Sequence, residues 1–339
     1  MSEKTIAEIL KEHTEAGFSP YAFRESQTKG REIPLPPSDV RGEYQRDRDR
    51  IIHSKSFRRL MHKTQVFLAP EEEHYRTRLT HTLEVTQIAR TIARALRLNE
   101  DLCEAASLGH DLGHTPFGHT GEKALTRYCL PEFTHYKQSL RVVEKLEKLN
   151  LTWEVRDGIV NHQGDHLAST LEGRVVKFAD RIAYINHDID DALRAGILME
   201  SDIPEKLHKI LGANHSARIN TMVVSIVRAS EGKNDIIMEP EIKAATDELR
   251  TFLFERVYYS PAVLSEEERA MELIVRLFEH FVKHPDEMGK SYRELCEGEP
   301  VERVVADFIS GMTDRHAISV YEKLFIPRTW TGAGLEVIT

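Results

Sequence analysis

The chain has 339 residues, enough for one large domain or two smaller ones. Hydrophobic residues make up 40% of it and charged residues 30%, as in a globular protein with its own core, and the net charge of −9 argues against a general nucleic-acid binder. Three widely spaced cysteines exclude a disulfide framework, and no stretch approaches the roughly 18 apolar residues of a membrane span. We therefore expect a soluble cytoplasmic protein with no membrane partner, for which nucleic acid is not the main partner.

The first 40 residues are predicted to form an N-terminal extension. Pro34, Pro36 and Pro37 close it in an extended, partly mobile segment, because proline fixes its own backbone and disfavours helix before it. From about residue 44 to residue 330, apolar residues recur at spacings of three and four, while the alternation typical of strands is scarce. The sequence therefore predicts an all-α protein.

Capping residues predict where the helices begin and end. Thr80 is expected to cap a helix that runs through Leu96. Asn99 is expected to cap the next helix, which ends at Gly113. Further helices are expected at 136–149, 154–162, 173–195, 203–212, 214–230, 240–257, 262–283 and 299–324.

The chain divides into four predicted parts, with a boundary near 196–204, where a glycine and a proline follow a long helix. The candidate catalytic and metal-binding residues lie before this boundary. The helical C-terminal part is expected to pack on the core and complete the pocket, although plain helix packing or an oligomer surface would leave the same pattern. The parts are the extension 1–40, a catalytic core 41–196, the C-terminal part 197–330 and a tail 331–339.

The most informative feature is the doublet His110-Asp111, with His81 upstream and Asp180 downstream. Histidine and carboxylate ligands suit a divalent ion that activates water. His81 lies on the inward face of its helix, because apolar residues follow it at four, seven and eleven positions. A lone buried histidine bonded to a backbone carbonyl would also explain that position. Four candidate ligands on three amphipathic helices favour a hydrolytic metal site.

A polar stripe follows the predicted helix 173–195. Asp180 begins the stripe. It continues four, seven, eight and eleven positions later, spacings that place side chains on one face of a helix, with Tyr184, His187, Asp188 and Asp191. A solvated face is the alternative. Because the rest of this helix is apolar, we expect the stripe to face a cavity or a cation.

The loop after the doublet carries His114, His119 and Glu122. Histidine and glutamate together suit proton transfer or the orientation of a neighbouring group, and the spacing of His119 and Glu122 places both on one side of a helical turn. The alternative is that these polar side chains lie on a solvent-exposed loop and have no function. His135 and His162 give weaker signals, and we interpret His135 as structural.

Residues 41–63 are positively charged, although the whole chain is negatively charged. They contain eight arginines and lysines and three acidic residues. Such a tract is typical of phosphate binding, because guanidinium groups grip phosphate oxygens in pairs. A solvated helix that pairs with acidic neighbours is the alternative. Motifs of nucleotide-binding folds and serine hydrolases are missing from the sequence.

The order His…His-Asp…Asp resembles the HD-domain phosphohydrolases, and the closer resemblance is to the deoxyguanosinetriphosphate triphosphohydrolase-like proteins of that superfamily. It spans roughly residues 40–326. The segments that carry it are Tyr-Gln-Arg-Asp-Arg-Asp-Arg-Ile-Ile-His at 44–53, Phe-Arg-Arg-Leu at 57–60, Lys-Thr-Gln-Val-Phe at 63–67, Arg-Thr-Arg-Leu-Thr-His at 76–81, Gly-His-Thr-Pro-Phe-Gly-His-Thr-Gly-Glu at 113–122 and Gly-Met-Thr-Asp at 311–314.

The resemblance implies an HD-domain helical core with additional C-terminal helices, and cleavage of a dNTP at the α-phosphorus to a deoxynucleoside and inorganic triphosphate. The implied metal ligands are His81, His110, Asp111 and Asp180, for an ion that is Mg, Mn, Fe, Co, Ni or Zn. The implied catalytic residues are His119, which acts at the α-phosphate, its partner Glu122, and His114. The implied substrate-binding residues are Arg59, Gln65, Arg78, Arg181, Tyr184 and Asp188. A homo-oligomer and a dNTP activator are further implications.

Two other functions stay open at this stage. An HD-type 5′-nucleotidase would release single phosphate, and a nucleotide-sensing regulatory protein would bind dNTP with little catalysis. The intact ligand set and the His119-Glu122 pair argue against the regulator. The family often reads His-Asn-Glu where this chain has His135-Tyr136-Lys137, so a carboxylate is missing from that loop.

Overall fold

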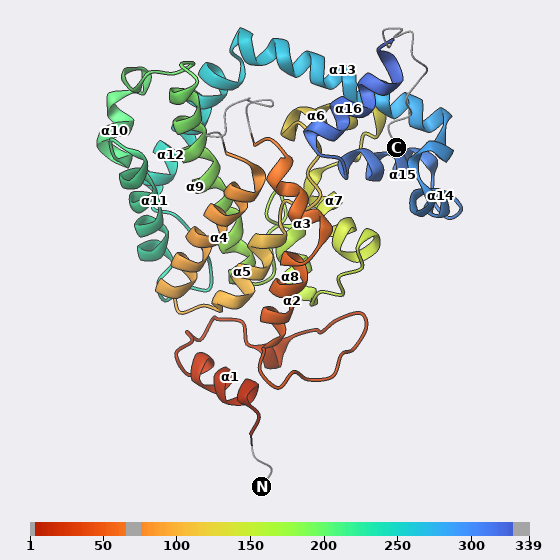
Figure 1. The fold of residues 1–339 in the computed structure, drawn as a ribbon. Helices are drawn as coiled ribbons and strands as arrows, with labels where there is room; N and C mark the ends of the chain where they lie inside the picture. The colour runs from red at the N-terminus through yellow and green to blue at the C-terminus, as the bar shows by residue number, and fades with distance from the viewer. Residues whose placement is uncertain (1–3, 66–75, 328–339) are drawn as a thin grey trace.

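The computed structural model describes residues 4–65 and 76–327, and within them it holds sixteen α-helices and no β-strand. The predicted all-α class is confirmed (Figure 1). The predicted tail 331–339 and the motif residues Val66 and Phe67 lie outside the described residues. In the described part, no helix is both long enough and apolar enough to cross a membrane.

The helices are, in chain order, α1 (Ile6–Ala16), α2 (Glu43–Ile52), α3 (Lys55–Arg59), α4 (Arg78–Ala95), α5 (Glu100–Gly109), α6 (Gly118–Ala124), α7 (His135–Arg141), α8 (Trp153–Val160), α9 (Leu171–Arg194), α10 (Glu205–Leu211), α11 (His215–Ser230), α12 (Pro240–Leu253), α13 (Pro261–Lys283), α14 (Lys290–Cys296), α15 (Val301–Ser310) and α16 (Asp314–Phe325). The longest connections between helices lie before α2 and before α4.

Helices α4, α5 and α9 pack against one another at the centre of the molecule (Figure 1). Their apolar residues recur at helical spacing, so that Val85 and Ile92 of α4 meet Ile182 and Ile189 of α9 in one fully buried cluster. Each such side chain contributes about 1.5–3 kcal/mol by leaving water. The same periodicity places the polar stripe of α9 on its remaining face.

Two further apolar clusters flank this centre. One joins α2, α5 and α8. The other joins α6 to α13, α15 and α16, and includes Phe117, Ile274 and Val304. The C-terminal helices therefore pack directly on the segment that follows the His110-Asp111 doublet.

Two predicted helix ends are wrong. Thr77, not Thr80, caps α4, because the Thr77 hydroxyl accepts a hydrogen bond from the Thr80 amide at 3.4 Å. The predicted helix 299–324 is two helices, since Thr313 caps a new helix by accepting from the amide of His316 at 3.3 Å. No helix was predicted at the positions of α1, α2, α3, α6 and α14, which have between 5 and 11 residues each and therefore show little apolar periodicity.

A buried ion pair ties the N-terminal extension to the core. The Arg31 guanidinium contacts Asp47, whose side chain is 0% exposed, and it also donates to the backbone carbonyl of Asn150 at 2.8 Å. Asp47 in turn accepts from the Thr152 amide at 2.9 Å and hydroxyl at 2.6 Å. One carboxylate thus joins the extension, α2 and the start of α8.

We expect Asp47→Asn to lower the free energy of unfolding by about 3–5 kcal/mol, because it leaves the Arg31 charge buried without its partner. Urea denaturation measures this. The matched control is Glu12→Gln, which breaks the exposed pair with Lys4 and should cost no more than about 1 kcal/mol. Equal losses in the two variants would contradict the anchoring role.

Candidate active site

A cavity of about 760 Å³ opens between the central helices and the C-terminal part. Residues of α4, α6 and α9 form one side of it, and residues from the end of α12 and from α13 form the other. Its volume suits a ligand of several hundred daltons. The C-terminal part therefore lines the same cavity as the predicted site residues.

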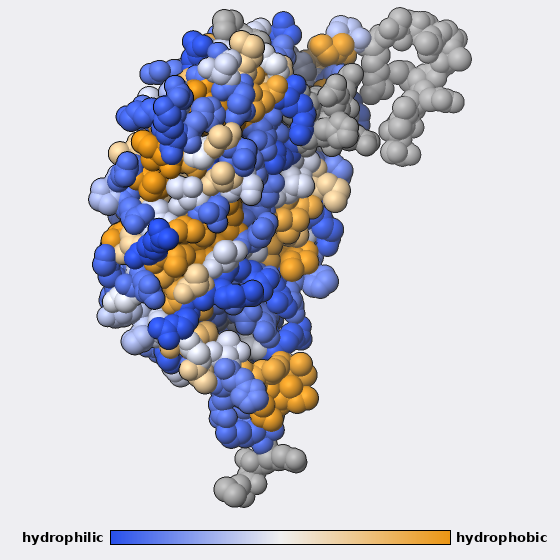
Figure 2. All heavy atoms as spheres, turned by 90° about the vertical axis from the view of Figure 1, so that its left-hand side faces the viewer, coloured by the Kyte–Doolittle hydropathy of each residue, from blue (hydrophilic) through white to orange (hydrophobic). Residues whose placement is uncertain are grey.

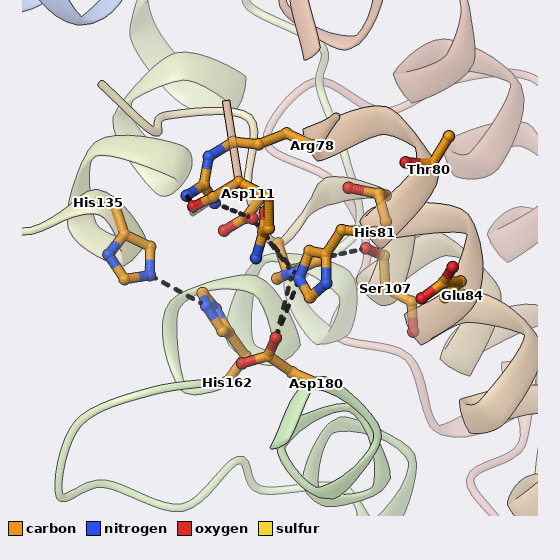
Figure 3. A network of polar contacts seen from close by, with 12 residues as sticks. Arg78, Thr80, His81, Glu84, Ser107, Asp111, His135, His162 and Asp180 are labelled. Carbon is orange, nitrogen blue, oxygen red and sulfur yellow. Dashed lines mark hydrogen bonds and ion pairs between the residues drawn. The ribbon is translucent and has the colours of Figure 1, made fainter. Parts of the chain in front are cut away.

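Three of the four predicted metal ligands, His81, Asp111 and Asp180, meet in the wall of this cavity (Figure 3), and the fourth, His110, lies within 3.8 Å of two of them. His81 Nε2 lies 3.1 Å from an Asp180 oxygen and 3.8 Å from an Asp111 oxygen. His110 Nε2 lies 3.6 Å from Asp111 and 3.8 Å from Asp180. Helix α4, the end of α5 and α9 each contribute to this group, which we call the His-Asp centre.

The chemistry of these donors fits a divalent cation. The Nδ1 atom of His110 donates to the Ser107 carbonyl at 2.6 Å, which leaves a lone pair on Nε2. That Nε2 is buried and has no hydrogen-bond partner among the described residues. Burial raises the pKa of Asp111, but the neighbouring His110 and Arg78 hold it well below its usual value. A bound ion would satisfy an ionised carboxylate and an orphaned imidazole at once.

Arg78 links the His-Asp centre to the open cavity. Its guanidinium donates to Asp111 at 2.6 Å and lies in the cavity wall. Arg78 is the first residue of α4, and His81 follows three positions later on the same face. The Thr77 cap therefore sets the position of both residues.

A second group faces the same cavity and is called the histidine–glutamate cluster. Glu122 accepts from His119 Nδ1 at 3.2 Å, from His135 Nδ1 at 2.8 Å and from the His135 amide at 2.8 Å. His114 completes the cluster, with its ring stacked on that of His135 at 4.5 Å between centroids. Burial raises the pKa of Glu122, but His135 and His119 bring it far below its usual value, so Glu122 is a carboxylate.

His135, interpreted from the sequence as structural, lies among the candidate site residues. It lies in the cavity wall on Glu122, and its Nε2 is 3.3 Å from Nε2 of His162. Burial and the neighbouring His110 lower the pKa of His162 to about 3, so that ring is neutral. No local pattern marks His135, because its partners come from elements thirteen and twenty-seven residues away.

The predicted substrate-binding residues separate into two groups. Those that line the cavity are Gln65, Arg78, Tyr184 and Asp188. Arg59 does not line it, because Ser56 and Glu147 hold its guanidinium at 3.1 and 3.3 Å. Arg181 does not line it either: it is one residue beyond Asp180, about 100° around the helix, and it pairs with Asp247 at 3.1 Å. For these two arginines, substrate binding stays a prediction.

Sequence reasoning missed one end of the cavity. Arg250, Phe254, Tyr258 and Tyr259 line it from the last turns of α12 and the π-turn that follows. The Tyr258 hydroxyl donates to Asp188, which joins this aromatic group to the stripe on α9. The helix was predicted, but an aromatic face on it resembles ordinary core.

Two C-terminal contacts hold the loop between α5 and α6. Phe117 and Gly118 both have positive φ angles, of 62° and 57°, which is rare for a residue such as phenylalanine. The Asp314 carboxylate accepts from the Phe117 amide at 2.9 Å and from the Thr64 amide at 2.8 Å. The buried Lys63 ammonium donates to the carbonyl of His114 in this loop and to that of a residue at the end of α15.

Comparison with known proteins agrees with this geometry. The HD-domain family model matches residues 78–185, and the model of a phosphohydrolase-associated domain matches residues 236–323. A deoxyguanosinetriphosphate triphosphohydrolase-like protein of Caldanaerobacter subterraneus is 54% identical over 96% of this chain and 97% of its own length. Another, from Desulfatibacillum aliphaticivorans, is 46% identical over 95% of this chain and 99% of its own.

The chain belongs to the deoxyguanosinetriphosphate triphosphohydrolase-like proteins. This confirms the resemblance on which the site residues were chosen. A solved phosphohydrolase of Bacteroides thetaiotaomicron has the same fold, with a TM-score of 0.54, 16% identity, and coverage of 86% of this chain and 71% of its own. Family and geometry together support a phosphohydrolase that depends on a metal ion.

We expect Asp314→Ala to release the loop at Phe117 and Gly118, because the positive φ angles there lose the acceptor that holds them. The free energy of unfolding should fall by about 2–4 kcal/mol, and the Phe117 amide should exchange with deuterium much faster. Glu322→Ala, at an exposed position of the same helix, is the control and should change neither quantity. Unchanged exchange at Phe117 in the Asp314 variant would contradict the anchoring of the loop.

Proposed function

We propose that this protein is a metal-dependent dNTP triphosphohydrolase, which converts a dNTP and water into a deoxynucleoside and inorganic triphosphate. One observation carries the proposal: the His-Asp centre and the histidine–glutamate cluster face one cavity, with Arg78 in its wall. Phosphoryl transfer needs positive charge on the phosphate oxygens and a proton for the leaving oxygen. The two groups supply these from neighbouring positions.

Four residues would hold the ion, namely His81, His110, Asp111 and Asp180. An ion bound there would bring positive charge to the phosphate oxygens and make water more acidic. Several divalent ions suit this set, so its identity among Mg, Mn, Fe, Co, Ni and Zn stays open. Arg78 would hold phosphate oxygens beside the ion while it keeps Asp111 ionised.

His119 would deliver the proton to the 5′-oxygen as that oxygen leaves the α-phosphorus. It is the most exposed member of the cluster, with 58% of its side chain accessible, so substrate can reach it. Glu122 accepts from its Nδ1 atom, which leaves Nε2 to carry the transferred proton. His135 bonds Glu122 and holds that carboxylate in place, while the neutral His114 would meet a phosphate oxygen.

The aromatic end of the cavity would hold the nucleoside. Tyr184, Phe254 and Tyr258 offer ring faces for a base or a sugar. Asp188, with Tyr258 as its partner, would accept from the 3′-hydroxyl of the sugar. Gln65 lies near the opposite, phosphate-binding end beside Arg78.

We also propose a cytoplasmic homo-oligomer. The three cysteines are free, as expected in a reducing compartment. Helix α1 buries none of its residues and exposes Ile6, Ile9 and Leu10 in an apolar patch at the lower end of the molecule (Figure 2). A second copy would cover such a patch. Activation by a second dNTP stays a prediction.

Product analysis tests the proposal directly. The metal-loaded chain is incubated with each dNTP, singly and mixed, and the products are separated by anion exchange. Inorganic triphosphate and deoxynucleoside in equal amounts are expected. Orthophosphate as the product would point to the 5′-nucleotidase, and bound but intact dNTP would point to the regulatory protein.

We expect His119→Ala to lower turnover by about 10²–10⁴-fold, because the leaving oxygen loses its proton donor. The variant should keep one equivalent of ion at the His-Asp centre, as elemental analysis would measure. His284→Ala, at an exposed position outside the cavity, is the control and should turn over normally. Normal product formation by the His119 variant would rule out its role.

A further inference from the structure

The histidine–glutamate cluster has the composition of a metal site of its own. His114, His119, Glu122 and His135 each offer one ligand atom, and these atoms all lie within 4.8 Å of one another. Three imidazoles and one carboxylate are ligands of the kind that hold Zn²⁺. None of these four residues belongs to the His-Asp centre, so two ions would not compete for a ligand.

The three rings are already spaced as ligands of one ion would be. Their centroids are 5.0 Å apart for His114 and His119, 4.5 Å for His114 and His135, and 5.6 Å for His119 and His135. Imidazoles that share a tetrahedral ion through bonds of about 2.0–2.1 Å hold their centroids about 5 Å apart. The rings of His114 and His135 lie 18° from parallel, so one of these two must turn for both to ligate one ion, whereas the largely exposed His119 is free to adjust.

His114 shows that the cluster lacks a partner. The side chain is fully buried in the cavity wall, and neither of its ring nitrogens has a hydrogen-bond partner among the described residues. Buried polar atoms are normally paired, and an unpaired one calls for an explanation. An ion in the cluster would take one of these nitrogens as a ligand.

His162 fixes the orientation of the His135 ring. The Nδ1 atom of His162 lies 2.7 Å from the Ile159 carbonyl, which can only accept, so Nδ1 carries the proton and Nε2 does not. His135 Nε2, at 3.3 Å, must then donate to it (Figure 3). His135 Nδ1 therefore faces the cluster, where it donates to Glu122 at 2.8 Å, and an ion bound there would take the place of that proton. Ligating histidines are usually oriented in this way by a second hydrogen bond.

The local charge permits a cation. Glu122 is ionised and sits between two imidazoles. The nearest fixed positive charge, on Arg78, is offset by Asp111, to which it is bonded at 2.6 Å. Mg²⁺ prefers oxygen ligands and would not fill a site with three nitrogens, whereas Zn²⁺, Co²⁺ and Ni²⁺ would.

We propose that the histidine–glutamate cluster is a second metal site, specific for ions that prefer nitrogen ligands, and that its occupation inhibits the enzyme. The inhibition rests on the proposed function, because a bound ion would take the lone pairs of His119 and the carboxylate of Glu122 away from proton transfer. The binding itself does not rest on it. Excess Zn²⁺ would then suppress turnover that Mg²⁺ leaves intact.

Metal stoichiometry tests the site without reference to activity. The full chain is stripped with a chelator, dialysed to equilibrium against Zn²⁺, and analysed for metal. We expect two ions per chain for the unaltered protein, and one for His119→Ala, His135→Ala and Asp111→Ala. Lys137→Ala, at an exposed neighbouring position, is the control and should bind two. His119→Ala keeps the test valid if the buried His135 variant does not fold.

One ion in the unaltered chain, or two in both cluster variants, would overturn the second site. Turnover with Mg²⁺ present and Zn²⁺ added should fall about a hundredfold or more as the second ion binds. Two bound ions with undiminished turnover would overturn the inhibition and contradict the proton-transfer role of His119, while the binding site would stand. A chain that binds two ions yet cleaves no dNTP would contradict the proposed function alone.

Discussion

The buried carboxylate of Asp111 is the constraint on which the site depends. A charge removed from water is costly unless surrounding groups compensate for it, and here the compensation comes from Arg78 at 2.6 Å, while the imidazoles of His81 and His110 lie 3.8 and 3.6 Å away. Those groups come from α4 and from the end of α5, so the two helices must meet at this point. The same arrangement leaves lone pairs and one guanidinium facing the cavity, and these are the elements of a phosphate and metal site.

The catalytic core does not form the site alone. The C-terminal part supplies the aromatic end of the cavity, and through Asp314 it holds the strained loop that carries His114 and precedes His119. Lys63 adds a second connection between that loop and α15. Both contacts involve residues matched by the model of the phosphohydrolase-associated domain. The helices far along the sequence are part of the site and fix its geometry.

Much of the site could be predicted because its signals are local or periodic. The doublet His110-Asp111, the stripe that begins at Asp180, and the turn that pairs His119 with Glu122 each lie within one helix or loop. His135 could not be predicted in its role, because Glu122 and His162 meet it only in the folded chain. Arg181 shows the limit of a local signal: its neighbour Asp180 lines the cavity, but successive helical residues point in different directions, and Arg181 pairs with Asp247. The split of 299–324 into two helices depends on a cap, which apolar periodicity does not reveal.

In the proposed reaction, both polar groups act on one phosphorus, the α-phosphorus of a dNTP. Hydrolysis in water enriched in oxygen-18, followed by mass spectrometry of the products, tests this most directly. Attack at the α-phosphorus with departure of the 5′-oxygen puts one heavy oxygen into inorganic triphosphate and none into the deoxynucleoside. Heavy oxygen in the deoxynucleoside, or in orthophosphate released from the far end of the substrate, would contradict the account.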